Sequence, residues 1–412
     1  MNFQKTMKKM KFNPYYTILI LLAIVAGISS CSTTPRAFKA DYAADYNTVA
    51  HTPRRPVLFA IKQGKGQVAL SVCVFTEGMV PDSTLPGSPA WQFRAVFENW
   101  DPAAKTIVHS QTFVETRRIN APFLPDTVWL NYTGNIDTTT GQYLILNLTD
   151  QVTGLSLYSW THVVDSLFPF VRDKDNNLLA NQWIKKNSNP ILPPNVSVDL
   201  CKTCDRPLPR PPFELQPVET MPPMHEWKSS FDITTNYSIP AGMLKVTSKE
   251  TDSAFFLPLV SNWFPYPVNN TDGLLAIRYI TTREEFFSLA ARNDPKEALY
   301  SIWQTSASDK ERAGERVRQF IAKITDANTF FTLSKPGSLT DQGLIWIVVG
   351  TPNRVWKSPF KETWFYDSLD DGLPLRLDFD LTTDSVGAQA WVLRRSPSYK
   401  TMWNRAVDRW RR

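Results

Sequence analysis

Histidine, cysteine and glycine are scarce in this chain of 412 residues, which contains four histidines, four cysteines and 16 glycines. So few potential ligands leave little material for a metal enzyme, and we expect neither a metal ion nor a cofactor. Long hydrophobic runs are also missing, because the run at residues 18–28 covers eleven positions and a membrane-spanning helix needs about 20. The hydrophobic content of 42% still supports two or three domains, which excludes a disordered polymer and a multi-span membrane protein.

A basic body that could clamp a polyanion is missing as well. The net charge is +6, but the first 30 residues contribute +4 and the last 19 contribute +6. Residues 31–393 therefore carry a net charge of −4, and we exclude nucleic acid as a partner.

The N-terminus has the composition of a targeting segment. Four lysines precede the apolar run, which ends in Ile28-Ser29-Ser30-Cys31. This ending resembles the bacterial lipobox, in which small residues precede a cysteine that receives a diacylglyceryl group. We therefore expect residues 1–30 to be a lipoprotein signal peptide and Cys31 to be lipidated, rather than a plain signal peptide or an uncleaved anchor. Residues 31–55 have little periodic apolar content and are interpreted as a tether.

Residues 56–164 show apolar residues at alternate positions, the period of a half-buried strand. Short strands are expected at 67–75, 91–98, 143–148 and 155–164. No long helical pattern interrupts them, so we predict an antiparallel β-sandwich.

Residues 165–268 are interpreted as a second β-rich domain. Its strands are expected at 198–200, 231–235, 244–247 and 255–260. The segment 205–223 contains seven prolines in 19 residues. It is either a polyproline ligand for another protein or a stiff connection that covers part of its own domain, and we favour the connection because the prolines lie inside one domain.

Cys201 and Cys204 form the one cysteine pair at motif spacing. A zinc site would need two more ligands, and neither a second such pair nor a histidine pair lies nearby. In the oxidising compartment that the N-terminus implies, a local disulfide is the favoured state. Cys73 lies within an expected strand and is interpreted as a buried small residue.

Near residue 274 the apolar period changes from two to 3.6. Helices are expected to start in a capping box at 282–285 and at 294–297, and a third should cover 309–331. Strands are expected at 344–349, 364–366, 375–381 and 389–393, with the first in the centre of the sheet because it is apolar throughout. Residues 269–412 are thus predicted to form an α+β domain.

The last residues, from about 398, have the pattern of a basic amphipathic helix. Its apolar stripe has three possible neighbours: its own domain, an anionic lipid surface, or a partner protein. We favour packing on its own domain.

The segment GSLTDQG at 337–343, with LIWIVVGTPNRV, ETWFYD and the closing RRSPSYKTMWNRAVDRW, resembles the GWxTD domain of Bacteroidota lipoproteins. Ser338 stands where that motif has tryptophan. The resemblance implies an architecture and a location, and no reaction. Ser32, rather than an aspartate, follows Cys31, which by analogy with other bacterial lipoproteins favours the outer membrane. No acidic export cluster follows Cys31, which favours the periplasmic face over the cell surface.

The motif residues are Gly337, Ser338, Thr340, Asp341 and Gly343. We expect Gly337 to adopt a backbone angle that other residues resist, and the side chains of Thr340 and Asp341 to bond local amides. A catalytic Asp341 would need a second acid or a histidine, and no histidine follows His225. A structural loop is therefore favoured over a catalytic or ligand site.

Seven aspartates begin an Asp-Ser or Asp-Thr triplet that resembles the O-glycosylation motif of Bacteroidota. The acceptors would be Ser83, Thr127, Thr138, Ser166, Ser253, Ser368 and Ser385. Ordinary turn chemistry is the alternative, and modification requires exposure, so only some of the seven are expected to be used.

Together these features predict a mixed fold, with a β-sandwich-like N-terminal region followed by an α+β C-terminal domain of the GWxTD type. No nucleophile, base and orienting group can be assembled from neighbouring motifs. The favoured function is therefore a non-catalytic outer-membrane lipoprotein, attached to the membrane by its lipid and binding other envelope proteins in an assembly or secretion complex. The alternative is an envelope hydrolase or carbohydrate-active enzyme.

Overall fold

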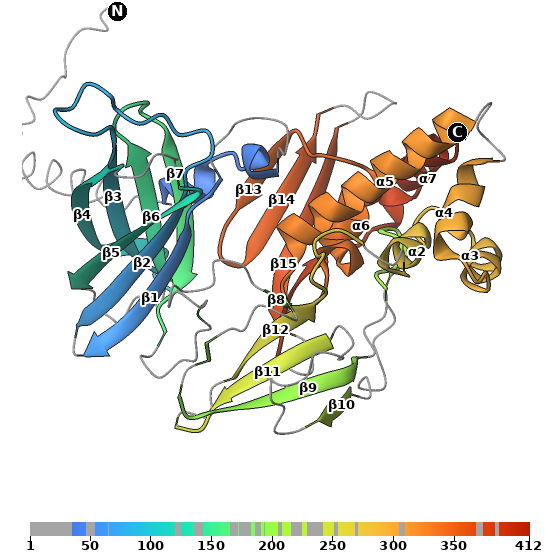
Figure 1. Cartoon of the computed structure of the whole chain (residues 1–412), viewed down its shortest axis with the longest axis horizontal. Helices are drawn as coiled ribbons and strands as arrows, with labels where there is room; N and C mark the ends of the chain where they lie inside the picture. The colour runs from blue at the N-terminus through green and yellow to red at the C-terminus, as the bar shows by residue number, and fades with distance from the viewer. Residues whose placement is uncertain are drawn as a thin grey trace, which may run out of the picture.

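A computed structural model of the chain places most of the residues that follow the N-terminal segment. The described residues are 35–46, 54–64, 66–119, 125–135, 143–164, 172, 183–185, 191–192, 194–204, 208–215, 225–228, 242–250, 254–267, 271–304, 310–367, 374–383 and 387–412. They form a strand-rich mixed fold, with the sandwich, a second sheet and a helix-covered sheet arranged side by side (Figure 1).

The N-terminal region is a sandwich of two antiparallel sheets (Figure 1). One sheet has the order β1 (Val57–Gly64), β2 (Gln67–Phe75), β5 (Thr127–Asn135), and the other β4 (Thr106–Arg118), β3 (Ala90–Asp101), β6 (Tyr143–Asp150), β7 (Ser156–His162). The alternating apolar residues of β2 and β3 are buried together in one core, as the period of two predicts. Burial of each large side chain there contributes about 1.5–3 kcal/mol to folding, so this core stabilises the packing of the two sheets.

The second sheet is small and lies below the other two bodies in Figure 1. Its order is β10 (His225–Lys228), β9 (Val196–Cys204), β11 (Gly242–Ser248), β12 (Ala254–Val260), β8 (Ile184–Lys185), in which β8 alone runs parallel to its neighbour. Three of the expected strands correspond to β9, β11 and β12, and the one expected at 231–235 lies outside the described residues.

The described part of the proline-rich segment, residues 208–215, lies against the C-terminal domain. The carbonyl oxygens of Arg210 and Pro212 accept hydrogen bonds from Arg395 Nη2 at 3.2 Å and from the Ser396 N–H at 3.1 Å. The ring of Phe213 packs on the domain's core. The described residues therefore cover part of the protein, as the favoured interpretation predicted, but the part that they cover is the C-terminal domain rather than the second β-rich domain.

The C-terminal domain packs helices on one face of a four-stranded antiparallel sheet (Figure 1). The helices are α2 (Thr271–Ile277), α3 (Arg283–Ala290), α4 (Pro295–Gln304), α5 (Lys310–Phe331), α6 (Asp341–Val348) and α7 (Lys400–Arg411), and the sheet has the order β13 (Arg354–Lys357), β14 (Lys361–Tyr366), β15 (Leu375–Thr383), β16 (Gln389–Leu393). The capping box that starts α3 is confirmed, since Thr282 Oγ1 accepts from the Glu285 N–H and the Glu285 carboxylate accepts from the Thr282 N–H.

The strand predicted at 344–349 is wrong, because these residues lie largely in α6. Every residue of α6 is buried, so the helix has no polar face and its sequence carries no 3.6-residue period. A continuous apolar run fits a central strand and a fully buried helix equally well. Here the helix is selected by the Thr340 cap at its start and by the surrounding layers of the domain.

Residues 35–46, called the N-terminal strap below, differ from the free tether that the sequence predicted. The strap forms two short 3-10 turns, η1 (Arg36–Lys39) and η2 (Ala43–Tyr46), between the sandwich and the C-terminal sheet (Figure 1). Ala37 is buried in a cluster with sandwich residues, and Tyr46 is buried in the core of the C-terminal domain. Such single buried residues on 3-10 turns leave no periodic pattern, so this packing could not be predicted from the sequence.

Candidate functional site

The two glycines of the GSLTDQG loop allow three backbone segments to touch. A Cβ atom at Gly337 would lie 1.9 Å from the carbonyl oxygen of Ala327 in α5, and one at Gly343 would lie 1.9 Å from the carbonyl oxygen of Gly337. Neither motif glycine is among the described residues with a positive φ, so the expected unusual angle at Gly337 is wrong. The glycines are needed because the loop lies directly against α5 and against the first turn of α6.

Thr340 behaves as the sequence predicted and binds local backbone groups. Its hydroxyl accepts from the Gly343 N–H at 3.0 Å, which caps α6, and donates to the Gly337 carbonyl at 2.7 Å. One side chain thus joins the 3-10 turn η3 (Gly337–Leu339) to the helix that follows.

Asp341 makes long-range bonds rather than the local ones that we expected. Its carboxylate accepts from Arg395 Nη2 at 2.6 Å and Nη1 at 2.9 Å, and from the Leu393 N–H at 2.8 Å. The side chains of Asp341 and Arg395 are 7% and 4% exposed. Both carboxylate oxygens are therefore occupied in a buried ion pair that ties the start of α6 to the end of β16.

Ser338, at the position of the motif's tryptophan, is fully buried, and its hydroxyl has no hydrogen-bond partner. Its backbone N–H donates to Asn328 Oδ1 at 2.9 Å, and its carbonyl accepts from the Tyr279 hydroxyl at 2.9 Å. Burial, followed by the nearby Asp341 carboxylate, raises the pKa of Tyr279 well above its ordinary value, which keeps this donor protonated.

Sequence reasoning missed Asn328, Tyr279 and Arg395 as members of this site. Asn328 bonds the loop through Oδ1, and its Nδ2 donates to the Pro265 carbonyl at 2.9 Å. The asparagine is completely buried in the last turn of an amphipathic helix, and a polar residue on the apolar stripe was the one available signal. We conclude that the loop is a bonded junction between α5, α6 and β16.

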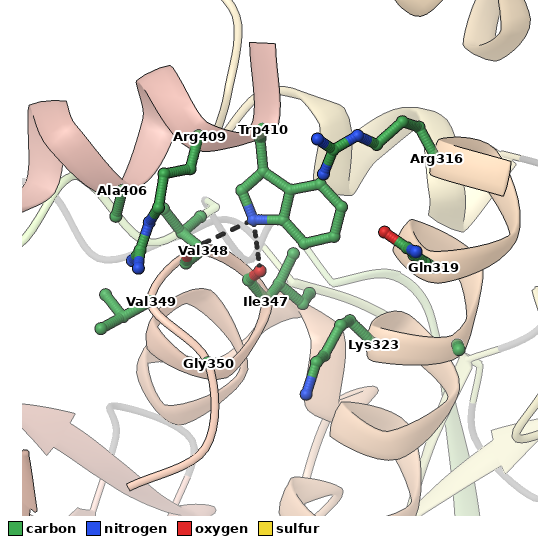
Figure 2. Close-up of a pocket in the computed structure, with 11 residues that line it drawn as sticks. Arg316, Gln319, Lys323, Ile347, Val348, Val349, Gly350, Ala406, Arg409 and Trp410 are labelled. Atoms are coloured by element: carbon green, nitrogen blue, oxygen red, sulfur yellow. Dashed lines mark hydrogen bonds between the residues drawn. The ribbon is translucent and has the colours of Figure 1, made fainter. Parts of the chain in front are cut away.

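Helix α7 packs on its own domain, which was the favoured one of the three alternatives. Trp403 and Ala406 are buried, and the Trp410 indole N–H donates to the carbonyl oxygens of Ile347 at 2.9 Å and Val348 at 3.2 Å (Figure 2). These carbonyls belong to the last turn of α6, where they lack helical partners. The C-terminal helix therefore caps the helix that the GSLTDQG loop begins.

A cavity of about 410 Å³ opens beside Trp410, between α5, α6 and α7 (Figure 2). Its floor is apolar, and Arg316, Lys323 and Arg409 carry cations around it. Burial lowers the pKa of Lys323, whose ammonium lies 4.7 Å from the centre of the Trp346 ring. Among the described residues that line the cavity there is no carboxylate, serine, cysteine or histidine. The cavity can hold an anionic group beside an apolar one.

An aromatic pair lies on the face of the C-terminal sheet that points away from the helices. Trp356 is 47% exposed and packs edge-to-face on Phe365, with 4.6 Å between ring centres. Two guanidinium groups lie over the Phe365 ring, that of Arg354 at 5.3 Å and that of Arg376 at 5.9 Å. These four residues are called the outer sheet face below, and they present a half-exposed indole within a prearranged cationic frame.

The structure contains Cys201 in a disulfide. The side chain of Cys204 lies outside the described residues, so the pairing of these two cysteines stays a prediction. Cys73 is a free, buried thiol, and burial raises its pKa to about 11, which keeps it protonated and unreactive.

Two of the seven possible glycosylation sites lie within the described residues. Ser83 and Thr127 are both exposed. The Asp82 carboxylate accepts from the Thr84 N–H at 2.8 Å, so turn chemistry is present at the first of them. Thr138, Ser166, Ser253, Ser368, Ser385 and the expected lipidation site Cys31 lie outside the described residues.

No group of three or more metal-ligating side chains is found among the described residues. Across the same residues, no helix is long and apolar enough to cross a membrane.

Comparison with known families gives one match, the GWxTD domain over residues 242–412. No curated protein matches the chain. The match begins at Gly242 and thus includes β11 and β12, whereas the sequence analysis placed the start of this domain at residue 269. With its loop, its buried Asp341 and its closing helix inside the matched region, residues 242–412 of this chain are a GWxTD domain.

Proposed function

We propose that this protein is a non-catalytic lipoprotein of the outer membrane, anchored through Cys31 on the periplasmic side, which binds other envelope proteins as part of an assembly or secretion complex. The anchor rests on the apolar run that ends in Ile28-Ser29-Ser30-Cys31. The interaction role rests on the outer sheet face.

The exposed indole of Trp356 is the observation that carries the interaction role. Tryptophan and arginine are enriched among the residues that contribute most to binding at protein interfaces. Trp356 is held against Phe365, and Arg354 is held by Asp367 at 2.9 Å, so little side-chain freedom is lost when a partner covers them. An acidic partner surface with an apolar recess would match both the ring and the flanking guanidinium groups.

The bonding of Asp341 also supports a non-catalytic role. A general acid or base must reach a substrate proton, and both oxygens of this buried carboxylate are bound to Arg395 and Leu393. Asp341 is thus bonded inside the domain, and we assign it to the stability of the junction.

The experiment is recovery of partners from native membranes, with the protein carrying an affinity tag. We expect Trp356→Ala to reduce recovery of the co-purifying proteins by about 30-fold, the effect of losing a 2 kcal/mol interface residue. Trp263→Ala is the matched control, because Trp263 is 67% exposed and lies outside the outer sheet face. Equal recovery with both variants would show that the outer sheet face is not the docking surface.

The anchor is tested separately by mass analysis of the mature N-terminus. We expect a chain that begins at Cys31 and carries acyl groups. An unmodified Cys31, or proteolysis of the folded protein in intact cells, would contradict the proposed location.

A further inference from the structure

The folded body begins almost immediately after the expected anchor. Pro35 is already buried, and Ala37 is 1% exposed. Three residues separate Cys31 from Pro35. The chain between the acyl groups and the packed protein is therefore far shorter than the tether of residues 31–55 that the sequence predicted.

Contacts at several points fix the strap to the body. The Tyr42 N–H donates to the Val355 carbonyl at 2.8 Å, and the Val355 N–H donates to Asp41 Oδ1 at 2.9 Å, so the strap pairs with the free edge of β13. The Tyr42 hydroxyl donates to the Ala37 carbonyl at 2.6 Å.

The end of the strap is held more deeply. Tyr46 is 5% exposed and lies among four aromatic rings of the C-terminal domain, those of Phe330, Phe331, Trp346 and Trp364. Its hydroxyl donates to the Glu362 carboxylate. A strap bound in this way cannot be pulled off the body by thermal motion at the anchor, so it does not lengthen the tether.

The reach of the remaining chain can be bounded from covalent geometry. An extended chain spans at most about 3.6 Å per residue, so the four steps from Cys31 to Pro35 cover at most about 14 Å. The interfacial layer on one side of a bilayer is itself about 5–8 Å thick. A body tethered this closely must touch the headgroups with the surface that surrounds the start of the strap.

We propose that this protein lies directly on the lipid surface, with the strap side of the molecule against the headgroups. The inference rests on the proposed lipid anchor at Cys31 and adds which face meets the bilayer. It assigns a lipid-facing role to the region around η1, the turn between β3 and β4, and the turn between β13 and β14.

The chemistry of that surface suits lipid headgroups. A row of rings underlies this surface from the strap to the C-terminal domain, with centre separations of 4.9 Å for Phe38–Trp100, 6.2 Å for Trp100–Tyr143 and 5.1 Å for Tyr143–Phe360. Trp100 is buried, and Phe38 and Tyr143 are partly exposed. Phe360, at the end of the row, is 45% exposed. Aromatic side chains favour the membrane interface.

Cations accompany this row of rings. Arg36, Lys39 and Lys105 are exposed, and each is able to approach an anionic headgroup. Acids lie in the same region and have partners within the protein. Asp41 accepts from the Val355 N–H and Asp101 from the Ala103 N–H, while Asp45 pairs with Lys357 and Glu98 lies near Arg36.

The test uses the mature chain from Cys31, coupled through its thiol to a maleimide lipid in vesicles of phosphatidylethanolamine and phosphatidylglycerol. Cys73 is buried and Cys201 is disulfide-bonded, and the mass of the N-terminal peptide verifies the coupling site. This attachment supplies the anchor chemically, so the result does not depend on whether the cell lipidates Cys31. Failure of the orientation and failure of the proposed lipidation are therefore distinguished.

Hydrogen exchange, measured by mass spectrometry, compares the coupled and the free chain. We expect exchange in residues 101–106 and 358–361 to slow by about tenfold on coupling, with no change in α3, which lies at the opposite end of the molecule from the sandwich (Figure 1). The matched control inserts a flexible Gly/Ser spacer of about 20 residues between Thr34 and Pro35, which adds a root-mean-square length of about 25 Å. The spacer should abolish the protection. Protection that persists with the spacer, protection of α3 instead, or no protection in the directly coupled chain would each overturn the inference.

Discussion

Replacement of Asp341 by asparagine should destabilise the C-terminal domain, because both carboxylate oxygens are used inside the protein. The carboxylate accepts two bonds from Arg395, at 2.6 and 2.9 Å, and one from the Leu393 N–H at 2.8 Å. With side chains 7% and 4% exposed, neither Asp341 nor Arg395 can exchange its partner for water.

The size of the expected loss in stability follows from the interactions that asparagine can and cannot make. It keeps the shape of aspartate but loses the charge, and its amide group places N–H donors where Arg395 needs acceptors. Breaking a buried ion pair by removing one partner costs about 3–5 kcal/mol, because the remaining charge is left uncompensated. We therefore expect Asp341→Asn to lower the free energy of unfolding of the C-terminal domain by about 3–5 kcal/mol.

The assay is urea unfolding followed by hydrogen exchange of peptides from α6 and β16. Asp380→Asn is the control, because Asp380 pairs with the neighbouring Arg394 in an ion pair whose side chains are 34% and 58% exposed. That pair should contribute less than about 1 kcal/mol. If Asp341→Asn unfolds at the same urea concentration as Asp380→Asn, the structural role that we assign to the motif aspartate is wrong.

A double variant separates the ion pair from other effects at the site. Arg395→Met combined with Asp341→Asn removes both charges, and such replacements of buried pairs are often close to neutral. We expect the double variant to be more stable than Asp341→Asn alone, apart from about 1 kcal/mol for the lost bond from Arg395 to the Arg210 carbonyl. Strictly additive losses would mean that the two side chains are not coupled.

Three further predictions concern the C-terminal helix, the strap and the cysteine pair. Truncation after Leu393 removes α7 with its two tryptophans and also Arg395, the buried partner of Asp341, and should lower stability by several kcal/mol. A wild-type melting temperature would show that neither α7 nor the ion pair stabilises the domain. Tyr46→Ala should also lower stability by about 3–5 kcal/mol, because it leaves a cavity among four rings. Tyr46→Phe loses only one hydrogen bond to a carboxylate, which is worth about 1.5–3 kcal/mol. Thermal denaturation of the two variants distinguishes packing from hydrogen bonding, and an unchanged melting temperature in both would contradict the docked strap. Thiol alkylation without reductant should leave Cys201 and Cys204 unlabelled, and stoichiometric zinc in the purified protein would contradict the predicted disulfide.

Features that depend on neighbouring residues could be predicted from the sequence. The alternation in β2 and β3, the capping box of α3 and the apolar stripe of α7 each reflect the period or the termini of one element. The Thr340 cap belongs to this group, because the hydroxyl and the amide that it accepts from are three residues apart. The GWxTD resemblance was also readable from short segments, and the family match over residues 242–412 confirms it.

Whether the residues of α6 form a helix or a strand could be decided only from the structure of the whole domain. Its residues are apolar at nearly every position, so neither period is visible, and burial on all sides is what permits such a helix. The choice between strand and helix was made by the layers around it, because a segment buried on every side meets no solvent that could impose a pattern.

The pairing of distant groups was likewise decided by the tertiary structure alone. Asp341 and Arg395 are 54 residues apart, and Tyr46 lies 316 residues from the carboxylate that it binds. A buried charge or ring needs a partner, but the sequence does not identify that partner. Many residues could serve, and the folded backbone brings one of them within a few ångströms. The amino-acid sequence thus determined the local elements and the GWxTD domain, while the bonded loop, the docked strap and the short reach to the proposed lipid anchor depend on contacts that exist only once the domains have packed.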